Sequence, residues 1–323
     1  MKVSRLIFRI IVFVIIGIVV NIFADWVLAE SKRDWIKAGR YYPKIQFKEF
    51  YQLPDNSLDL VMIGSSLCYY GIDPFIIRKK TGLTCFNLGT PRQPLSATYY
   101  LLKEMYDYQK PEYIILELHY EILTRTYLQL YKTYVLNNIK ISFNKINLFL
   151  KGFSTKEKIH CFLPLLQDHN AIKYIFNKIT NNQENPFAGR EEYIGLGYVR
   201  SYEKIDRQKN GYIDYEWDEK AITPEVRYYY PRIVKLIEDH NSQLIVINFP
   251  YSELVEIKNS KEFWHNYRKF VQIEDNIIIF NYLNSDMEFP LADFFDLHHF
   301  NSNGSQKITN SISDSLNHIM LHR

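Results

Sequence analysis

Cysteine is scarce in this chain, whose 323 residues include only Cys68, Cys85 and Cys161. Three cysteines are too few for a disulfide scaffold, and their spacing does not match a zinc-binding cluster. Glycine and proline number twelve each, which excludes a collagen-like or linker-like chain. Charge of one sign is also nearly absent, because 39 Lys and Arg oppose 36 Asp and Glu. This balance argues against a dedicated nucleic-acid binder.

The remaining composition is that of a folded protein. Hydrophobic residues make up 47% of the chain and charged residues 23%, which excludes global disorder. The length fits one enlarged α/β domain, or one domain with an insert. The 26 tyrosines and 21 phenylalanines are unusual. They could fill an ordinary core or offer an aromatic surface on which sugars stack.

A single long apolar run lies near the N-terminus, at residues 10–24 (IIVFVIIGIVVNIFA). It approaches the ~20 residues that cross a bilayer, and the basic residues before it favour a cytoplasmic N-terminus. We therefore predict that residues 1–28 form a cytoplasmic tip and a transmembrane signal anchor, with the membrane contacted through residues 10–28. The protein would then be a single-pass protein of the cell membrane with an extracytoplasmic domain. A signal peptide cleaved near residue 29 and a buried helix of a soluble domain are the alternatives.

The rest of the chain alternates between short apolar strands and helices. A polar, aromatic-containing neck is expected at residues 29–57, followed by an α/β domain at 58–323. Strands are predicted at residues 59–63, 83–88, 113–118, 244–249 and 277–280, and helices at 73–80, 95–108, 226–239 and 301–321. Continuous apolar runs of this kind are typical of a parallel sheet that is buried on both faces. Residues 121–222 interrupt the pattern, and we expect a mostly helical insertion that acts as a lid or a partner surface.

Two separated segments carry the candidate chemistry. Ser66 directly follows the first predicted strand, where ligands meet the carboxyl ends of parallel strands. Asp296 and His299 lie three residues apart just before the last helix, so the carboxylate can orient the imidazole toward a serine hydroxyl. Ser66 could instead be an ordinary helix cap. The C-terminal segment could instead hold a metal through Asp293, Asp296, His298 and His299.

These segments resemble the sequence blocks of the SGNH/GDSL hydrolase superfamily. Gly64-Ser65-Ser66 resembles the Gly-Asp-Ser block, with Ser65 in place of Asp, and Asn87-Leu88-Gly89 resembles the glycine block. Asp296-x-x-His299 resembles the final block. Gly71-Ile72-Asp73-Pro74 is similar to the membrane-anchored branch, which includes the D-alanyl transfer protein of teichoic acid modification and accessory proteins of exopolysaccharide O-acetylation. The resemblance implies a three-layer, flavodoxin-like parallel sheet.

The resemblance also implies a role for each matching residue. Ser66 would be the nucleophile, His299 the general base and Asp296 the residue that orients it. The oxyanion hole would use the backbone N–H groups of Ser66 and Gly89. The family's third block commonly supplies an Asn side chain to this hole, but this chain has Leu116-Glu117-Leu118-His119-Tyr120 there. The candidates to replace that Asn are Arg92, Gln93 and His119. No cofactor and no metal is expected.

The function expected from these features is O-acyl transfer outside the cytoplasm. A serine-dependent O-acyltransferase would modify a cell-surface or exported glycan through an acyl-serine intermediate, beside a multi-span membrane O-acyltransferase. One alternative is a membrane-anchored esterase or lipase, which differs only in using water as the acceptor. The other is a non-catalytic scaffold that binds a glycan or a membrane partner.

Overall fold

The computed structural model describes residues 7–9, 11–13, 15–17, 19, 42–126, 129–161, 190–206, 211–283 and 287–322. The chain divides into two compact units. The first unit consists of Met1–Tyr41 and Phe153–Ala188, and its described elements are short helical stretches between residues 7 and 19 and helix α9 (Thr155–Cys161). The second unit consists of Tyr42–Gly152 and Gly189–Arg323 and holds the other elements.

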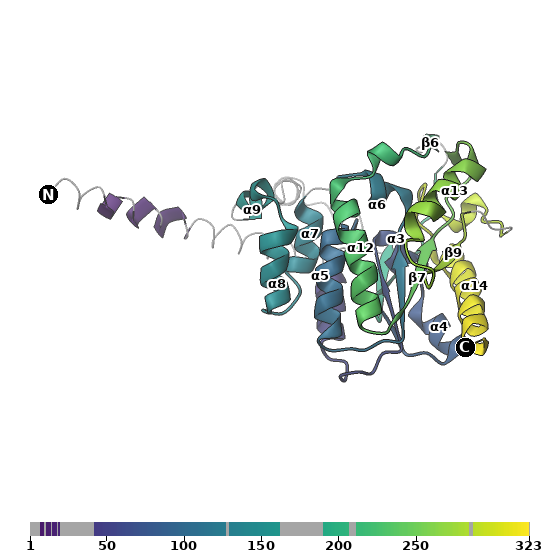
Figure 1. Cartoon of the computed structure of the whole chain (residues 1–323), viewed down its shortest axis with the longest axis horizontal. Helices are drawn as coiled ribbons and strands as arrows, with labels where there is room; N and C mark the ends of the chain where they lie inside the picture. Colours follow the sequence, from purple (N-terminus) through teal and green to yellow (C-terminus); the bar gives the residue numbers. More distant parts are fainter. Residues whose placement is uncertain are drawn as a thin grey trace. The chain divides into compact units, whose positions relative to one another are not determined.

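A five-stranded parallel sheet forms the centre of the second unit (Figure 1). Its strands are β1 (Leu60–Ile63), β2 (Cys85–Asn87), β3 (Tyr113–Glu117), β7 (Gln243–Asn248) and β9 (Ile278–Asn281). They are arranged in the order β2-β1-β3-β7-β9, with every neighbouring pair parallel. Each strand lies within two residues of its predicted run. The prediction of an α/β domain with a central parallel sheet is confirmed, and the strand order is that of flavodoxin-like folds.

Helices cover both faces of the sheet. One face is covered by α3 (Ser66–Gly71), α4 (Pro74–Thr81) and α14 (Ser302–Leu321), and the other by α5 (Leu95–Tyr106), α12 (Pro224–Asp239) and α13 (Ser260–Val271) (Figure 1). Met62, Ile115 and Ile247 pack in one buried cluster with Ile308 and Ile312 of α14. The strand residues between them point to the opposite face and are equally buried, because side chains alternate along a strand. The unit is therefore a three-layer α/β/α sandwich.

The compact unit begins earlier than the sequence predicts. Residues 29–41 of the predicted neck lie outside the described residues, but helix α2 (Tyr42–Phe50) belongs to the second unit. Its residues Tyr42, Gln46, Phe47 and Phe50 recur on one helical face and are buried. The Gln46 amide also donates to the backbone oxygen of Asn87, at 2.7 Å. In the structure the boundary thus lies at Tyr42 rather than at residue 58.

The region predicted as a mostly helical insertion, residues 121–222, contains both helices and strands. Its helical elements are α6 (Tyr120–Thr124), α7 (Gln129–Leu136), α8 (Phe143–Asn147), the π-helical turn η1 (Leu148–Gly152), α9 and the 3-10 turn η2 (Glu219–Ala221). Its strands are β4 (Glu191–Gly195), β5 (Tyr198–Ser201) and β6 (Ile213–Tyr215). Residues 162–189 lie outside the described residues. The strands at residues 191–195, 198–201 and 213–215 are a difference from the mostly helical insertion that the sequence predicts.

The pairing of these strands explains the difference. β4 and β5 form an antiparallel hairpin, and β6 pairs in parallel with β8 (Val255–Ile257), some forty residues further along the chain. Such a partner leaves no local pattern in the sequence. The remaining element is the 3-10 turn η3 (Leu291–Asp293).

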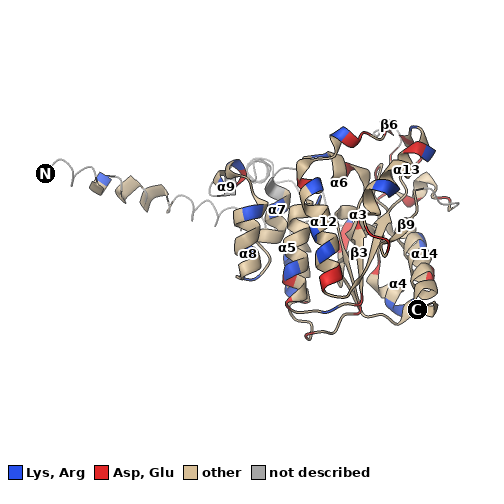
Figure 2. Cartoon of the chain, in the orientation of Figure 1, with Lys and Arg blue, Asp and Glu red and all other residues tan. Residues whose placement is uncertain are grey.

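The predicted membrane span at residues 10–28 falls largely outside the described residues. In the part of the chain that the structure describes, no helix is long and apolar enough to cross a membrane. Figure 2 shows Lys and Arg interspersed with Asp and Glu along α12 and α13, in keeping with the near-balanced charge of the whole chain.

Candidate active site

Ser66 is the first residue of α3, directly beyond the carboxyl end of β1. The connecting residue Gly64 has φ +155°, and a Cβ atom at this position would lie 2.6 Å from Cβ of Glu117. Only glycine fits such a close approach in this conformation. Ser65 caps the helix by accepting a hydrogen bond from the Leu67 N–H, at 3.2 Å. The Ser66 N–H lies in the first turn, where backbone donors have no intrahelical acceptor.

Glu117 is buried at the carboxyl end of β3, where it holds Ser65 and His119. Oε2 of Glu117 accepts two hydrogen bonds from Ser65, one from the backbone N–H at 2.8 Å and one from the side-chain hydroxyl at 2.6 Å. Its Oε1 accepts the backbone N–H of His119 at 3.1 Å and lies 2.6 Å from His119 Nδ1. Burial raises the pKa of Glu117, but His119 and Ser65 outweigh burial and hold this pKa below its usual value. Glu117 is therefore ionised, and it positions the loop after β1 through Ser65 and the loop after β3 through His119.

A continuous hydrogen-bonded chain joins Ser66, His299 and Asp296. The Ser66 hydroxyl lies 2.7 Å from Nε2 of His299. Nδ1 of the same ring lies 2.9 Å and 2.8 Å from the two carboxylate oxygens of Asp296. Ser66 and His299, 233 residues apart in sequence, thus meet in the geometry that activates a serine hydroxyl.

The Asp296 carboxylate is held by its own loop as well. Oδ1 accepts the backbone N–H groups of His298, at 2.9 Å, and of His299, at 2.8 Å. Burial raises the pKa of Asp296, but the His299 imidazole and the two N–H groups outweigh burial and hold this pKa well below its usual range. The carboxylate is therefore charged at neutral pH and fixes the orientation of the His299 ring.

Ser66, Asp296 and His299 line a cavity of about 190 Å³. The other lining residues are Ser65, Leu67, Arg92, His119, Glu121, Arg125, Ile213 and His298. Five of the seven predicted site residues therefore come together here. Gly89 and Gln93 do not line this cavity.

Gly89 and Gln93 are occupied by structural hydrogen bonds. The Gly89 N–H donates to the side-chain oxygen of Asn87, at 3.0 Å. The buried Gln93 amide accepts from Thr90 and donates to Thr98, both at 2.9 Å. The predicted oxyanion donor at Gly89 is thus engaged within its own loop, because the Asn87 side chain folds back over the turn that follows β2.

Arg92 and His119 do reach the cavity. Arg92 has a positive φ of 45°, and its guanidinium donates to the Tyr131 hydroxyl at 3.0 Å and lies 5.4 Å from the centre of that ring. His119 is buried, with Nδ1 against Glu117. Its Nε2 is the nitrogen left for a ligand.

A second group of polar side chains, which the sequence does not predict, lies beside Ser66, His299 and Asp296. The Tyr215 hydroxyl donates to Oε1 of Glu121 and lies 2.9 Å from Nε2 of His298, and Arg125 lies 2.7 Å from the same Glu121 oxygen. We call Glu121, Arg125, Tyr215 and His298 the glutamate wall, and Ser66, Asp296 and His299 the serine wall. Nothing in the local sequence signals Tyr215, because it comes from the insertion.

His298 and Glu121, both in the glutamate wall, differ in charge state at neutral pH. Burial lowers the pKa of His298 to about 4, against the opposing effect of Glu121. Burial raises the pKa of Glu121, but the Tyr215 hydrogen bond and the nearby histidines and Arg125 bring this pKa below its usual value. At neutral pH the glutamate wall therefore contains a neutral imidazole and a carboxylate.

The alternative of a metal site is not supported. Asp293 pairs with Lys307 Nζ at 2.6 Å instead of joining Asp296 and His298. Among the described residues, no three His, Cys, Asp or Glu side chains are placed to hold a metal ion.

The chain matches no protein-family model and no curated protein sequence. Several solved structures are similar at low levels, and three of them follow. A protein from Desulfitobacterium hafniense DCB-2, assigned to the G-D-S-L lipolytic family, is 12% identical with a TM-score of 0.36, over 79% of this chain and 97% of that one. The acetyl xylan esterase Est2A from Butyrivibrio proteoclasticus is 11% identical with a TM-score of 0.34, over 83% and 66%. A protein from Bacteroides fragilis NCTC 9343, assigned as an acylhydrolase, is 10% identical with a TM-score of 0.39, over 84% and 94%.

Proposed function

We propose that this chain is a serine-dependent acyl-transfer enzyme of the SGNH type. The observation that carries the proposal is the hydrogen-bonded chain from the Ser66 hydroxyl through His299 to Asp296. A serine hydroxyl is a weak nucleophile unless an adjacent base accepts its proton. Here the base lies at hydrogen-bond distance, and a charged carboxylate orients it.

The reaction runs in two half-reactions. His299 Nε2 takes the proton of Ser66 as Oγ attacks the acyl carbonyl, and the imidazolium then protonates the leaving group. The resulting ester on Ser66 is attacked by the acceptor hydroxyl, whose proton passes to His299. The Ser66 Oγ–carbon bond breaks, and His299 returns the proton to Ser66. Asp296 stabilises the imidazolium in both halves.

The oxyanion would be bound by the Ser66 N–H and by His119. Because ionised Glu117 can only accept a hydrogen bond, Nδ1 of His119 carries a hydrogen, and Nε2 donates to the oxyanion in the imidazolium form of the ring. His119→Leu is expected to lower kcat about 10²–10³-fold, the usual cost of one oxyanion donor. His119→Gln retains an N–H donor and should recover part of this loss. Equal activity of the two variants would exclude His119 from this role.

The acceptor that we propose is a hydroxyl of a cell-surface or exported glycan, with the domain outside the cytoplasm and residues 10–28 in the membrane. This location is supported by the apolar run at residues 10–24 and the basic residues before it. A reporter fused after residue 35 should behave as extracytoplasmic. A cytoplasmic reporter would contradict the topology and leave the acyl-serine chemistry untouched.

A multi-span membrane acyltransferase is the partner that we propose, because acyl-coenzyme A is not available outside the cytoplasm. Ile141 and Phe143 within the insertion are 92% and 85% exposed, which is typical of a surface that a partner covers. Co-purification of such a partner should be lost in the Ile141→Ser/Phe143→Ser variant. Phe75→Ser, at a partly exposed phenylalanine of α4, is the matched control and should keep the partner.

The central test is covalent. Full-length protein in mild detergent is treated with a fluorophosphonate probe, and the modified residue is mapped by mass spectrometry. The expected adduct is on Ser66, together with a burst of p-nitrophenol from p-nitrophenyl acetate. A folded sample that labels at Ser65, or that shows neither adduct nor burst, would refute the proposal.

A further inference from the structure

Three members of the glutamate wall, Glu121, Arg125 and His298, line the same cavity as the serine wall, yet the acyl-serine chemistry does not use them. His298 directly precedes the proposed base, but its ring is turned away from Ser66. Its Nε2 lies 2.9 Å from the Tyr215 hydroxyl, and the ring packs edge-on against Tyr251, with centres 5.1 Å apart. Both the hydrogen bond and the packing hold the ring in one orientation.

The hydrogen bonds of Tyr215 fix which atoms of Glu121, Tyr215 and His298 carry a hydrogen. Tyr215 has one hydroxyl proton, and it donates this proton to Glu121, which is ionised and can only accept. The Tyr215 oxygen can therefore only accept from His298, so the hydrogen of the neutral imidazole lies on Nε2. The other nitrogen, Nδ1, then carries a lone pair and no hydrogen.

The wall consequently holds both acceptors and donors on residues that line the cavity. Among the described residues, neither Nδ1 of His298 nor Oε2 of Glu121 has a hydrogen-bond partner. Arg125 uses one nitrogen for Glu121 Oε1, and its side chain is 55% exposed, so further N–H groups remain for a ligand. A single reacting water at His299 would make none of its own contacts to these positions, whereas a molecule with adjacent hydroxyls can react through one hydroxyl and donate and accept through the next.

We propose that the glutamate wall is the acceptor subsite and that it selects a polyhydroxylated acceptor of the carbohydrate class. This rests on the proposed acyl-serine function. One acceptor hydroxyl faces His299, gives up its proton there and forms the new ester bond. A neighbouring hydroxyl donates to His298 Nδ1 and accepts from Arg125. The reactive hydroxyl is thereby held in position, which favours transfer over hydrolysis.

The test measures how the acetyl-enzyme partitions. Full-length protein in detergent is acetylated with p-nitrophenyl acetate in the presence of methyl β-D-glucopyranoside or propan-1-ol, and the ratio of ester product to free acetate is measured. Both products come from the same intermediate, so the ratio does not depend on the acylation rate. For the wild type, the ratio per mole of acceptor should be at least tenfold higher with the glucoside.

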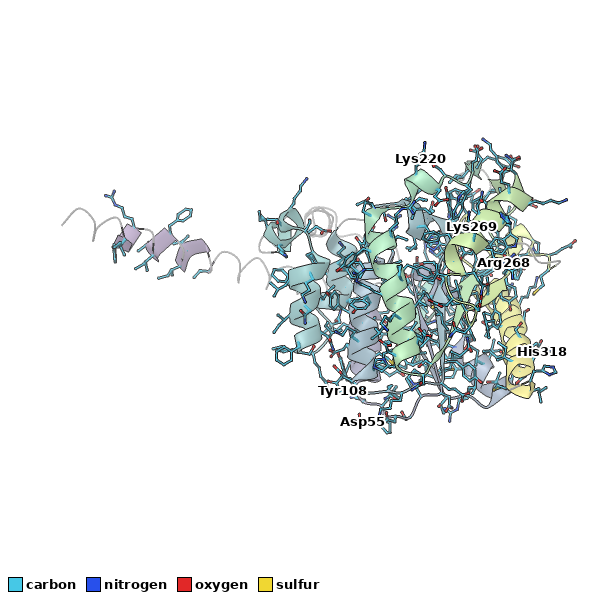
Figure 3. The ribbon with its side chains drawn as sticks, in the orientation of Figure 1. Asp55, Tyr108, Lys220, Arg268, Lys269 and His318 are labelled. Atoms are coloured by element: carbon cyan, nitrogen blue, oxygen red, sulfur yellow. The ribbon has the colours of Figure 1, made fainter. Side chains whose placement is uncertain are left out.

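Variants connect this preference to the wall. His298→Ala and Glu121→Gln should each lower the glucoside ratio about tenfold and leave the propan-1-ol ratio within twofold. His298→Asn places an amide oxygen near the lost Nδ1 and should recover part of the preference. Tyr215→Phe, which keeps the ring, tests the same group without a large loss of packing. His318→Ala is the matched control, because His318 is exposed near the end of α14 (Figure 3). At 1.5 Å per residue, it lies about 24 Å along the helix from Ser302.

The outcomes separate the two proposals. If the wild type forms no acetyl-serine, the proposed function itself fails. If the acetyl-serine forms but the glucoside is no better an acceptor than propan-1-ol, the acceptor subsite is refuted and the acyl-serine chemistry stands. An unchanged glucoside ratio in both His298→Ala and Tyr215→Phe would equally refute the subsite.

Discussion

His298 and His299 are neighbours on one loop, and both line the same cavity, but they belong to different walls. The His299 ring lies between the Asp296 carboxylate and the Ser66 hydroxyl, in direct contact with both. The His298 ring reaches a carboxylate only through the hydroxyl of Tyr215, which stands between it and Glu121. The first arrangement gives the imidazolium a direct counter-ion, and the second does not.

The two histidines are the same residue type, so the group that each imidazole contacts decides what the ring can do. Without a counter-ion in contact, burial dominates for His298 and lowers its pKa to about 4. A ring that stays neutral at physiological pH can accept a hydrogen bond but is a poor base for moving protons. The serine wall therefore suits proton transfer, and the glutamate wall suits recognition.

The largest expected effect comes from removing the nucleophile of the serine wall. Ser66→Ala should lower kcat for p-nitrophenyl acetate by about 10⁴–10⁶-fold and abolish fluorophosphonate labelling. Ser65→Ala should still label at Ser66. It should melt at a lower temperature, because it loses the helix cap and one hydrogen bond to Glu117. Labelling that disappears in Ser65→Ala and persists in Ser66→Ala would exchange the roles of the two serines.

The next effect compares the two histidines directly. His299→Ala should lower kcat by about 10⁴-fold or more, and Asp296→Asn by less, about 10²–10⁴-fold, because an unoriented base retains some activity. His298→Ala should be mild when p-nitrophenol release is measured. If His298→Ala abolished release and His299→Ala did not, the assignment of the final sequence block would be shifted by one residue.

The third effect is on the free energy of unfolding, and it tests the close contact between Gly64 and Glu117 next to the serine wall. Gly64→Ala forces a Cβ atom to within 2.6 Å of Glu117 Cβ at a φ of +155°, so it should destabilise the fold by about 3 kcal/mol or more. Gly82→Ala is the matched control. It also has a positive φ, of 78°, but open space around it, so about 1 kcal/mol is expected. Denaturant unfolding measures both, and equal losses would contradict the close contact with Glu117.

The smallest effect is the pH dependence that the glutamate wall adds to stability. The pKa of His298 is about 4 in the folded state and about 6.5 when unfolded, so the unfolded chain binds the extra proton first. Stability from this group is complete above pH ~6.5 and is lost as the pH falls toward 4, by at most about 3 kcal/mol. His298→Asn should flatten this part of the profile of unfolding free energy against pH. Identical slopes for the wild type and His298→Asn between pH 6.5 and 4 would show that His298 is not held neutral by burial.

Much of the framework can be predicted from the sequence. The sequence predicts the five strands to within two residues, because each is a continuous apolar run of the kind that a sheet buried on both faces requires. The sequence also draws attention to Ser66, Asp296 and His299, because each lies next to a recognisable element boundary, and the structure joins their side chains by hydrogen bonds. Helix α2 and the pair β6–β8 were not predicted, since their burial depends on partners far away in the chain.

The sequence by itself thus determined the parallel sheet and the positions of the three serine-wall residues, because apolar periodicity and strand ends are local properties. Only the tertiary structure decided which neighbours each polar group would have. It engaged the Gly89 N–H with Asn87, placed Glu117 beneath Ser65, and brought Tyr215 from the insertion to His298. Hydrogen bonds act over about 3 Å and ignore separation along the chain. A residue's charge and role therefore become defined only when the folded chain supplies its partners.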